Sequence, residues 1–414
     1  MKVSSTSYPR NKIKILLLEN ISDSAVAEMN ASGYLEIERM NGALSEAQLM
    51  SAVKGVHLIG IRSKTHITAK VIAAADKLVA IGCFCIGVNQ VDLKAATEKG
   101  VAVFNAPHAN TRSVAELVIG LCVMLIRKIS DKNAAAHRGE WLKESKGSFE
   151  LRGKTLGIIG YGKIGIQTGL LAEAIGMRVV YHDIEARLPL GNATPATTLT
   201  ALLQEADVVT LHVPQTERTR LLIAAERLAQ MKPDAVLINL ARGHAVDLDA
   251  LHVALGAHRL RGAAIDVFPT EPTSNAAVFE SPLRELDNVI LTPHVGGSTA
   301  EAQHNLGVEV SEKLRDYLTL GAVRGSVNLP EVSVGTLRSP ARLVHIHRDQ
   351  PGVMSQLNGV LAVAGFNVSQ LHLETDAGFG VAVIDLNRPL DNATLAAAAG
   401  VAGTVRAFTV HAPA

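Results

Sequence analysis

The sequence predicts an α/β protein with two doubly wound parallel-sheet domains and a small C-terminal domain of βαββαβ, ferredoxin-like order. Three observations carry this prediction. Short apolar runs alternate with helix-patterned stretches, a glycine-rich motif follows one of these runs, and the last runs change to the βαββαβ order. Alternating buried strands and helices are typical of parallel sheets covered on both faces. With 414 residues, 48% of them hydrophobic, the chain has enough material for several cores.

The first parallel sheet is predicted from apolar runs in the first quarter of the chain. Strands are expected at residues 12–19, 57–62, 78–83 and 101–105, with a helix at 68–77. Pro107 breaks this pattern, and residues 113–129 have the periodicity of one long apolar helix. We therefore expect a domain boundary near residue 107.

A second parallel sheet is predicted to begin after Leu151. Its strands are expected at residues 155–159, 177–181, 208–212, 235–239, 262–267 and 289–291. An amphipathic helix at 300–318 is expected to return to the first sheet. The first domain would then be discontinuous, residues 1–107 and 298–336, around a second domain at 108–297. Residues 321–339, rich in Gly, Pro, Ser and Val, are expected to be a linker.

The third domain is predicted at residues 340–414. Strands are expected at 343–347, 366–374, 381–386 and 404–410, and helices at 353–364 and 393–399. A turn at 376–378 joins the two middle strands. This order is the βαββαβ plan.

Composition and charge restrict the class of protein. The formal net charge is +1, which does not indicate nucleic acid or an anionic membrane as a partner. The first apolar run, residues 13–18, is much shorter than the roughly 20 residues of a membrane span. The three cysteines are few for this length, which favours a reducing compartment. We therefore expect a cytoplasmic protein.

The glycine-rich motif predicts a dinucleotide site. Gly160, Gly162 and Gly165 form G-x-G-x-x-G directly after an apolar run and before an amphipathic stretch. The first glycine would form a tight turn, the second would let the backbone approach a pyrophosphate, and the third would let the helix pack on the sheet. The helix N-terminus offers free N–H groups to the phosphates.

Asp183, at the end of the next predicted strand, supports this assignment. It lies at about the distance beyond the glycines at which a carboxylate binds the ribose hydroxyls. Such a carboxylate repels a 2′-phosphate, so NAD is expected rather than NADP. The alternative is an ordinary βα turn in which Asp183 only caps the strand end.

Three polar residues follow predicted strands of the same domain and are candidates for catalysis: Arg242, Glu271 and His294. Ligands of open α/β sheets gather at the carboxyl ends of the strands. Oxidation of a 2-hydroxy acid needs a base near neutral pKa, which a histidine supplies, and a carboxylate partner would orient the imidazole. An arginine binds a substrate carboxylate through its fork of donors. Taken singly, each residue also has an ordinary structural explanation, as a loop histidine, a surface ion pair or a turn residue.

Together, these segments resemble the D-2-hydroxyacid dehydrogenase family over nearly the whole chain. The resemblance implies that Arg242 binds substrate, that His294 is the proton donor and that Glu271 is its partner. It also implies a set of NAD contacts, which comprises the three glycines with Lys163, Ile164, Asp183, Leu240, Ala241, Arg242, Asp266, His294, Val295, Gly296 and Gly297. Relatives often have histidine at position 163, where Lys163 would add a cation near the pyrophosphate.

The resemblance is strongest to the branch of the family that ends in an ACT domain. It implies oxidation of D-3-phosphoglycerate to 3-phosphohydroxypyruvate with NAD, the first step of L-serine synthesis, by a homotetramer. Residues implied on the substrate side are Arg62, which would hold the phosphate, Ser63, Asn110 and, more weakly, Lys143 near Trp141. The alternatives are a dehydrogenase or reductase of another 2-hydroxy or 2-oxo acid, such as 2-oxoglutarate, or an NAD-sensing corepressor, although corepressors tend to carry a disordered tail.

The same resemblance implies L-serine as an effector of the ACT domain. Serine would lie between two such domains and contact His347, Asn367 and the position of Asp349, where relatives have asparagine. Aspartate only accepts hydrogen bonds and would repel the serine carboxylate. We therefore expect serine to inhibit, but more weakly than with asparagine at 349. The alternative is that this domain only joins subunits.

No metal site is expected. Cys83 and Cys85 have C-x-C spacing without another cysteine nearby, and the histidines show no metal-binding motif. The two cysteines are expected to lie in a strand and its loop.

Overall fold

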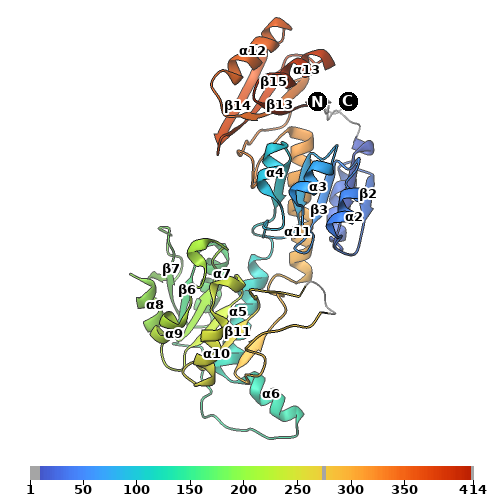
Figure 1. Cartoon of the computed structure of the whole chain (residues 1–414). Coiled ribbons are helices and arrows are strands. Elements are labelled where there is room, and N and C mark those ends of the chain that lie inside the picture. The colour runs from blue at the N-terminus through green and yellow to red at the C-terminus, as the bar shows by residue number, and fades with distance from the viewer. Residues whose placement is uncertain (1–9, 273–276, 412–414) are drawn as a thin grey trace. The chain divides into compact units, whose positions relative to one another are not determined.

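The computed structural model describes residues 10–272 and 277–411 (Figure 1). The chain divides into two compact units, residues 1–109 with 303–414 and residues 110–302. Each unit is described below by itself.

The first sheet of unit 1 has five parallel strands in the order β2-β1-β3-β4-β5. The strands are β1 (Lys14–Leu17), β2 (Glu36–Arg39), β3 (Leu58–Ile61), β4 (Ala80–Cys83) and β5 (Ala102–Asn105). The helices between them are α1 (Asp23–Ala31), α2 (Glu46–Ala52), α3 (Ala69–Ala74) and α4 (Leu93–Glu98). Strands β3, β4 and β5 are buried along their whole length, which explains their continuous apolar runs.

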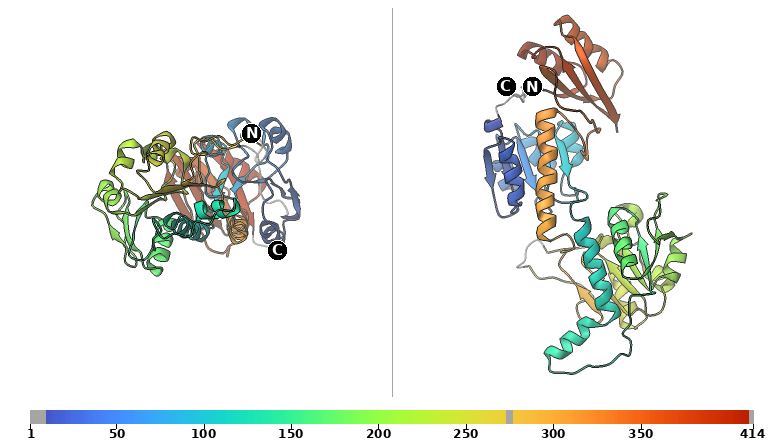
Figure 2. Two further views of the ribbon diagram at one scale, coloured as in Figure 1. Left: turned by 90° about the horizontal axis from the view of Figure 1, so that it is seen from below. Right: turned by 180° about the vertical axis from the view of Figure 1, so that it is seen from behind.

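Helix α11 (Ala300–Leu320) packs against this sheet, although it follows in sequence only after unit 2 (Figures 1 and 2). Val310 and Leu314 of α11 lie directly over Gly82 of β4, where any side chain would collide with them. A single apolar core, which includes Leu17, Phe104 and Tyr317, joins the helix to the sheet.

The C-terminal part of unit 1 is a four-stranded antiparallel sheet in the order β14-β15-β13-β16. Its elements are β13 (Ala341–Arg348), α12 (Val353–Val363), β14 (Val368–Asp376), β15 (Phe379–Leu386), α13 (Asn392–Ala399) and β16 (Thr404–His411). The predicted βαββαβ order is confirmed. Leu343, Leu357 and Ile384 belong to the core under the two helices.

Unit 2 contains a seven-stranded parallel sheet. Its strands are β6 (Thr155–Ile159), β7 (Arg178–His182), β8 (Thr194–Pro195), β9 (Val208–Leu211), β10 (Val236–Asn239), β11 (Gly262–Ile265) and β12 (Val289–Leu291). Its helices are α5 (Thr111–Ile126), α6 (Ile129–His137), α7 (Lys163–Ala174), α8 (Leu199–Glu205), α9 (Ala225–Gln230) and α10 (Leu248–Gly256).

The strand order of unit 2 is β12-β11-β10-β9-β6-β7-β8, so the winding reverses between β6 and β9. All pairings are parallel, and the carboxyl ends of the strands therefore lie at one edge. The crevice at such a reversal is where open α/β sheets bind ligands. The predicted doubly wound class is confirmed for this unit and for the first sheet.

Four local features differ from the sequence prediction, and the first is the short strand β8, which was not expected. Strand β2 was not expected, because its Glu-Ile-Glu-Arg sequence lies mostly exposed at the edge of the sheet. The long helix expected at 113–129 ends at Ile126, and α6 begins at Ile129 after Lys128 adopts a left-handed conformation (φ 53°). The expected linker is packed rather than free, since Val323, Leu329 and Val332 are buried in the unit 1 core.

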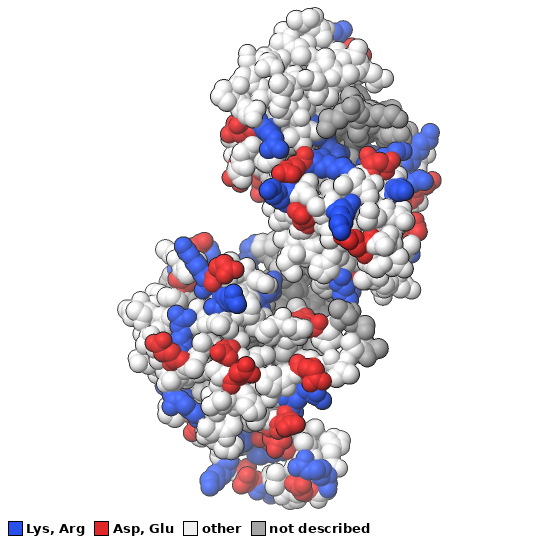
Figure 3. Space-filling view, in the orientation of Figure 1, with Lys and Arg blue, Asp and Glu red and all other residues white. Residues whose placement is uncertain are grey.

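In the part of the chain that the structure describes, no helix combines the length and apolar character needed to cross a bilayer. On the face shown in Figure 3, basic and acidic side chains are interspersed.

Candidate active site

The three predicted catalytic residues follow three neighbouring strands of unit 2. Arg242 lies after β10, Glu271 lies on the loop after β11, and His294 lies after β12. Because these strands are adjacent and parallel, their following loops meet at the same edge of the sheet.

Glu271 and His294 form a hydrogen-bonded pair. Nδ1 of His294 lies 2.9 Å from Oε2 and 3.0 Å from Oε1 of Glu271. This hydrogen bond, opposed by partial burial, raises the pKa of His294 above its ordinary value. Burial works to raise the pKa of Glu271, but the hydrogen bond and charge of His294 outweigh it and lower that pKa. The pair therefore favours an imidazolium beside a carboxylate, with Nε2 left for exchange with a substrate.

Arg242 lies beside this pair because two loops pack tightly. A side chain at Gly243 would collide with the backbone of Phe268, so glycine is required there for the β10 loop to pack on the β11 loop. The amide of Phe268 donates to Oε1 of Glu271 (3.2 Å), which holds that carboxylate. The positive charge of Arg242 contributes to lowering the pKa of both Glu271 and His294.

Asp266 holds the loop that carries His294. Its buried carboxylate accepts hydrogen bonds from the Thr292 hydroxyl (2.6 Å) and from the amides of Val295 (2.8 Å) and Gly296 (2.9 Å). His294 itself has a left-handed backbone (φ 55°), which is uncommon for a residue with a side chain. Its amide donates to the Asp266 carbonyl (2.8 Å). The Asp266 contacts thus fix an unusual loop geometry from both sides of the histidine.

The glycine motif fits a dinucleotide. Gly160 has φ 92°, and a side chain there would lie 2.7 Å from the His212 carbonyl oxygen. A side chain at Gly165 would collide with the Gly160 carbonyl, whereas one at Gly162 would meet nothing within 4 Å. Gly162 therefore faces open space just before α7 begins at Lys163. This backbone leaves room for a pyrophosphate at a helix N-terminus.

Asp183 lies directly after β7, next to the glycine loop. Its Oδ2 accepts the Tyr161 amide (2.8 Å) and its Oδ1 accepts the Glu185 amide (3.0 Å). The carboxylate is thus held at the end of β7 beside the position expected for a ribose.

The remaining predicted cofactor residues also belong to unit 2. Leu240 and Ala241 are buried in the β10 loop, and Ile164 is half-buried in the first turn of α7. Gly297 lies so close to the side chain of Asn110 that any side chain at position 297 would collide with the Asn110 amide nitrogen. This contact places Asn110, at the start of α5, beside the His294 loop. Lys143, by contrast, is exposed on the segment after α6.

Arg62 and Ser63 lie in unit 1, after β3. Their loop is held by Glu19, whose buried carboxylate accepts the amides of Arg62 (3.1 Å), Lys64 (3.0 Å) and Thr65 (2.8 Å). Gln90 donates to the Arg62 carbonyl (2.9 Å). These contacts fix the backbone, and the Arg62 side chain remains partly exposed.

The predicted effector residues lie at opposite ends of the C-terminal sheet. His347 pairs with Gly380 at the end of β13, and Asp349 follows it, whereas Asn367 precedes β14 at the end where Leu386 lies. At about 3.3 Å per residue along a strand, one chain cannot bring His347 and Asn367 to a molecule as small as serine. A site that uses both would need two copies of the sheet.

Three site features were missed by sequence reasoning. Glu19 follows β1 just as the predicted residues follow their strands, so the same signal was available. Tyr161 and Tyr181 stack with ring centroids 3.8 Å apart, beneath the glycine loop and β7. His212 is half-buried after β9, where desolvation of its imidazole lowers its pKa to about 3, and its carbonyl packs against Gly160. No local pattern marks the last two.

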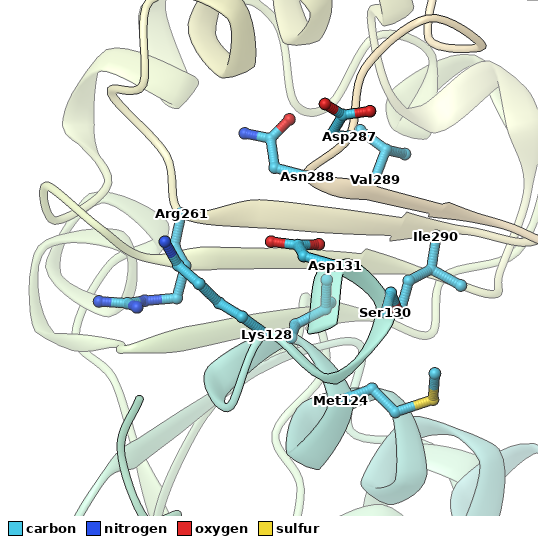
Figure 4. Close-up of a pocket in the computed structure, with 10 residues that line it drawn as sticks. Met124, Lys128, Ser130, Asp131, Arg261, Asp287, Asn288, Val289 and Ile290 are labelled. Carbon is cyan, nitrogen blue, oxygen red and sulfur yellow. The ribbon is translucent and has the colours of Figure 1, made fainter. Parts of the chain in front are cut away.

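Within the described ranges there is no cluster of His, Cys, Asp and Glu that would hold a metal, and none of the three cysteines forms a disulfide. A small pocket is lined by Lys128, Asp131, Arg261 and Asp287, among others (Figure 4). Arg261 and Asp287 precede β11 and β12, so this pocket lies at the amino ends of the strands, at the edge opposite the motif residues.

Two protein families match the sequence. Residues 119–296 match the NAD-binding domain of D-isomer-specific 2-hydroxyacid dehydrogenases, and residues 343–395 match the ACT domain of the AHAS small-subunit type. D-3-phosphoglycerate dehydrogenase of Escherichia coli is 52% identical over 99% of this chain and 100% of its own length.

Solved structures of related enzymes cover about three-quarters of this chain. D-lactate dehydrogenase of Aquifex aeolicus, complexed with NAD and lactic acid, has a TM-score of 0.67 at 26% identity, over 77% of this chain and 100% of its own. The NADPH-dependent glyoxylate/hydroxypyruvate reductase of Sinorhizobium meliloti has a TM-score of 0.65 at 28% identity, over 76% and 97%. With the Glu271–His294 pair and the glycine loop in place, the chain belongs to the D-isomer-specific 2-hydroxyacid dehydrogenase family of NAD-dependent oxidoreductases, and carries an ACT domain at its C-terminus.

Proposed function

We propose that this protein oxidises D-3-phosphoglycerate to 3-phosphohydroxypyruvate with NAD, the first step of L-serine synthesis. The structural observation that carries the proposal is the Glu271–His294 hydrogen bond with Arg242 beside it, at the carboxyl edge that also holds the glycine loop. The full-length similarity to a D-3-phosphoglycerate dehydrogenase supports this choice of substrate.

His294 is the proposed acid/base. Glu271 occupies Nδ1, so Nε2 takes the hydroxyl proton in oxidation and returns it in reduction. NAD, held by the glycine loop and Asp183, would supply the acceptor for the hydride that leaves the hydroxyl-bearing carbon. Arg242 binds the substrate carboxylate through its guanidinium fork and orients that carbon. The raised pKa of His294 suits it to hold the proton that oxidation releases.

The proposed cofactor contacts come from the edge of unit 2. The glycine motif with Lys163 and Ile164 binds the pyrophosphate, Asp183 binds the adenosine ribose, and the loops after β10, β11 and β12 contact the rest. The residues of these last loops are Leu240, Ala241, Arg242, Asp266, His294, Val295, Gly296 and Gly297.

Arg62 is the proposed phosphate anchor, with Ser63 beside it. A guanidinium matches phosphate geometry through paired donors, and Glu19 holds the backbone of this loop in place. Asn110 and Lys143 are proposed as further substrate-side residues. Asn110 has the stronger support, because it lies against Gly297 of the His294 loop.

The ACT domain is proposed to bind L-serine between two copies of the chain. His347 and Asp349 of one copy would face Asn367 of another, since a single sheet holds them at opposite ends. A homotetramer is the proposed assembly. The cytoplasm is the proposed location, in keeping with three cysteines that form no disulfide.

The test is substrate turnover by the purified chain. NAD reduction is followed with D-3-phosphoglycerate, and NADH oxidation with a panel that includes 3-phosphohydroxypyruvate, 2-oxoglutarate and pyruvate. We expect the phosphorylated substrate to have the highest kcat/KM. A higher value for an oxo acid without phosphate would overturn the substrate assignment, and no turnover of any of them would favour a binding role.

A further inference from the structure

Arg187 lies four residues beyond Asp183 and is held by two carboxylates. Its Nη2 is 2.6 Å from Oε2 of Glu185, and its Nε is 3.7 Å from Oδ2 of Asp183. The Arg187 side chain is 40% exposed, whereas the Asp183 side chain is 10% exposed. A guanidinium thus lies at the ribose end of the predicted NAD site, and both acids compete for it.

The backbone that carries Arg187 is anchored. The Tyr181 hydroxyl donates to the Arg187 carbonyl (2.8 Å), and Tyr181 stacks on Tyr161 of the glycine loop with an angle of 14° between the rings. Burial raises the pKa of both phenols, so they remain neutral. The backbone of Arg187 is therefore tied to the stacked tyrosines beside the glycine loop, while its side chain lies partly exposed at the surface.

Arg187 with Asp183 and Glu185 resembles a phosphate-binding site in which two carboxylates take the place of the phosphate. A 2′-phosphate carries close to two negative charges and binds an arginine through paired donors. The carboxylates of Asp183 and Glu185 repel a phosphate, and they also pair with the Arg187 guanidinium that would bind it. The fold itself does not exclude the phosphate, because the Sinorhizobium meliloti reductase carries NADP.

We propose that Arg187 is a latent anchor for the 2′-phosphate of NADP, and that Glu185, together with Asp183, determines coenzyme choice by holding it. This inference deepens the NAD assignment and is independent of which hydroxy acid is the substrate. Glu185 is the better position for a test substitution, because its side chain is 64% exposed. Replacing that side chain leaves both amide contacts of Asp183 intact.

The experiment measures coenzyme binding without substrate, by isothermal titration of NADH and NADPH into the full-length protein. We expect Glu185→Gln to tighten NADPH about three- to tenfold, a modest part of the roughly ten- to hundredfold that one charge-assisted contact is worth, because Asp183 still competes. NADH affinity should stay within about twofold of wild type. Asp183→Ser/Glu185→Gln should bring NADPH close to NADH.

Two variants separate the anchor from simple loss of repulsion. Adding Arg187→Ala to Glu185→Gln should return NADPH affinity to the wild-type value. If the gain in NADPH affinity survives in that double variant, the acids act by repulsion alone and the anchor is wrong. No gain in Glu185→Gln would overturn the role of Glu185.

The matched control is Glu205→Gln. Glu205 pairs with Arg178 (2.5 Å) at the opposite, amino end of β7. The Glu205→Gln substitution therefore removes one negative charge from the same unit, as Glu185→Gln does, but away from the ribose end. Glu205→Gln should leave the affinities for NADH and NADPH unchanged. If it tightened NADPH as much as Glu185→Gln does, the effect would come from net charge alone. Because titration needs no turnover, a failure of this inference is distinguishable from a wrong substrate assignment.

Discussion

Glu271 and His294 are 23 residues apart in sequence, and their side chains are joined by a hydrogen bond of 2.9 Å between Oε2 and Nδ1. Each residue shifts the pKa of the other in the direction that favours the charged pair. The raised pKa of His294 contributes stability that is fully present below its ordinary value of 6.5 and is lost as pH rises through the raised value. The lowered pKa of Glu271 contributes stability above 4.5 that is lost as pH falls through the lowered value.

The first prediction concerns the pH profile of reduction. Protonated His294 is the donor in that direction, so kcat/KM should fall as pH rises through its raised pKa. Glu271→Gln removes the negative charge, lowers the pKa of His294 and should move this alkaline limb to lower pH. The measurement is NADH oxidation with 3-phosphohydroxypyruvate between pH 6 and 10. An unchanged limb would show that another group titrates.

The second prediction concerns His294 itself. His294→Ala should leave NADH affinity nearly intact and lower turnover by roughly 10²–10⁴-fold, the usual contribution of a general acid/base. Rapid kinetics and NADH titration on the same preparation check both parts. Turnover close to wild type would remove His294 from the mechanism.

A third prediction concerns Asp266, which accepts three hydrogen bonds from the His294 loop. Asp266→Asn keeps one acceptor oxygen and should destabilise the loop by about 1.5–3 kcal/mol, with a lower Tm and lower kcat. Thr292→Val removes only one of the three bonds and is the graded control. Equal losses in the two variants would contradict a specific role of the carboxylate.

Substrate choice provides the fourth prediction. Arg62→Ala should lower kcat/KM for 3-phosphohydroxypyruvate by about ten- to hundredfold, since a charge-assisted contact is worth about 1.5–3 kcal/mol. Reduction of 2-oxoglutarate or pyruvate should change little. Lys64→Ala, which removes an exposed charge from the same loop, is the control. An equal loss for every substrate would make Arg62 structural.

The last prediction concerns the ACT domain. L-Serine should inhibit the wild-type protein, and Asp349→Asn should lower the inhibitory concentration, because asparagine donates to the serine carboxylate and ionised aspartate repels it. Asp349 is exposed, so the substitution should not disturb folding. Serine titrations of both proteins decide the matter. Stronger inhibition with aspartate would reverse the argument, and no inhibition of either would leave the domain with a role in assembly.

The sequence alone determined the fold class, because strands buried on both faces need continuous apolar runs and helices need their own period. It could not determine β2, whose edge position needs no apolar run, or the break before α6, which depends on the backbone of Lys128. The glycine motif could be recognised from a short stretch of sequence. Its tight turn, the space for a ligand at its backbone and the close packing of its helix all follow from the absence of a side chain at the three glycines.

Tertiary structure alone decided which residues meet. Arg242, Glu271 and His294 come together only because β10, β11 and β12 are neighbours, an order set by contacts between distant parts of the chain. The same holds for Glu19 beneath the Arg62 loop and for the separation of His347 from Asn367. Residue type limits what a side chain can do, whereas its partners depend on strand order and register, which local sequence does not encode.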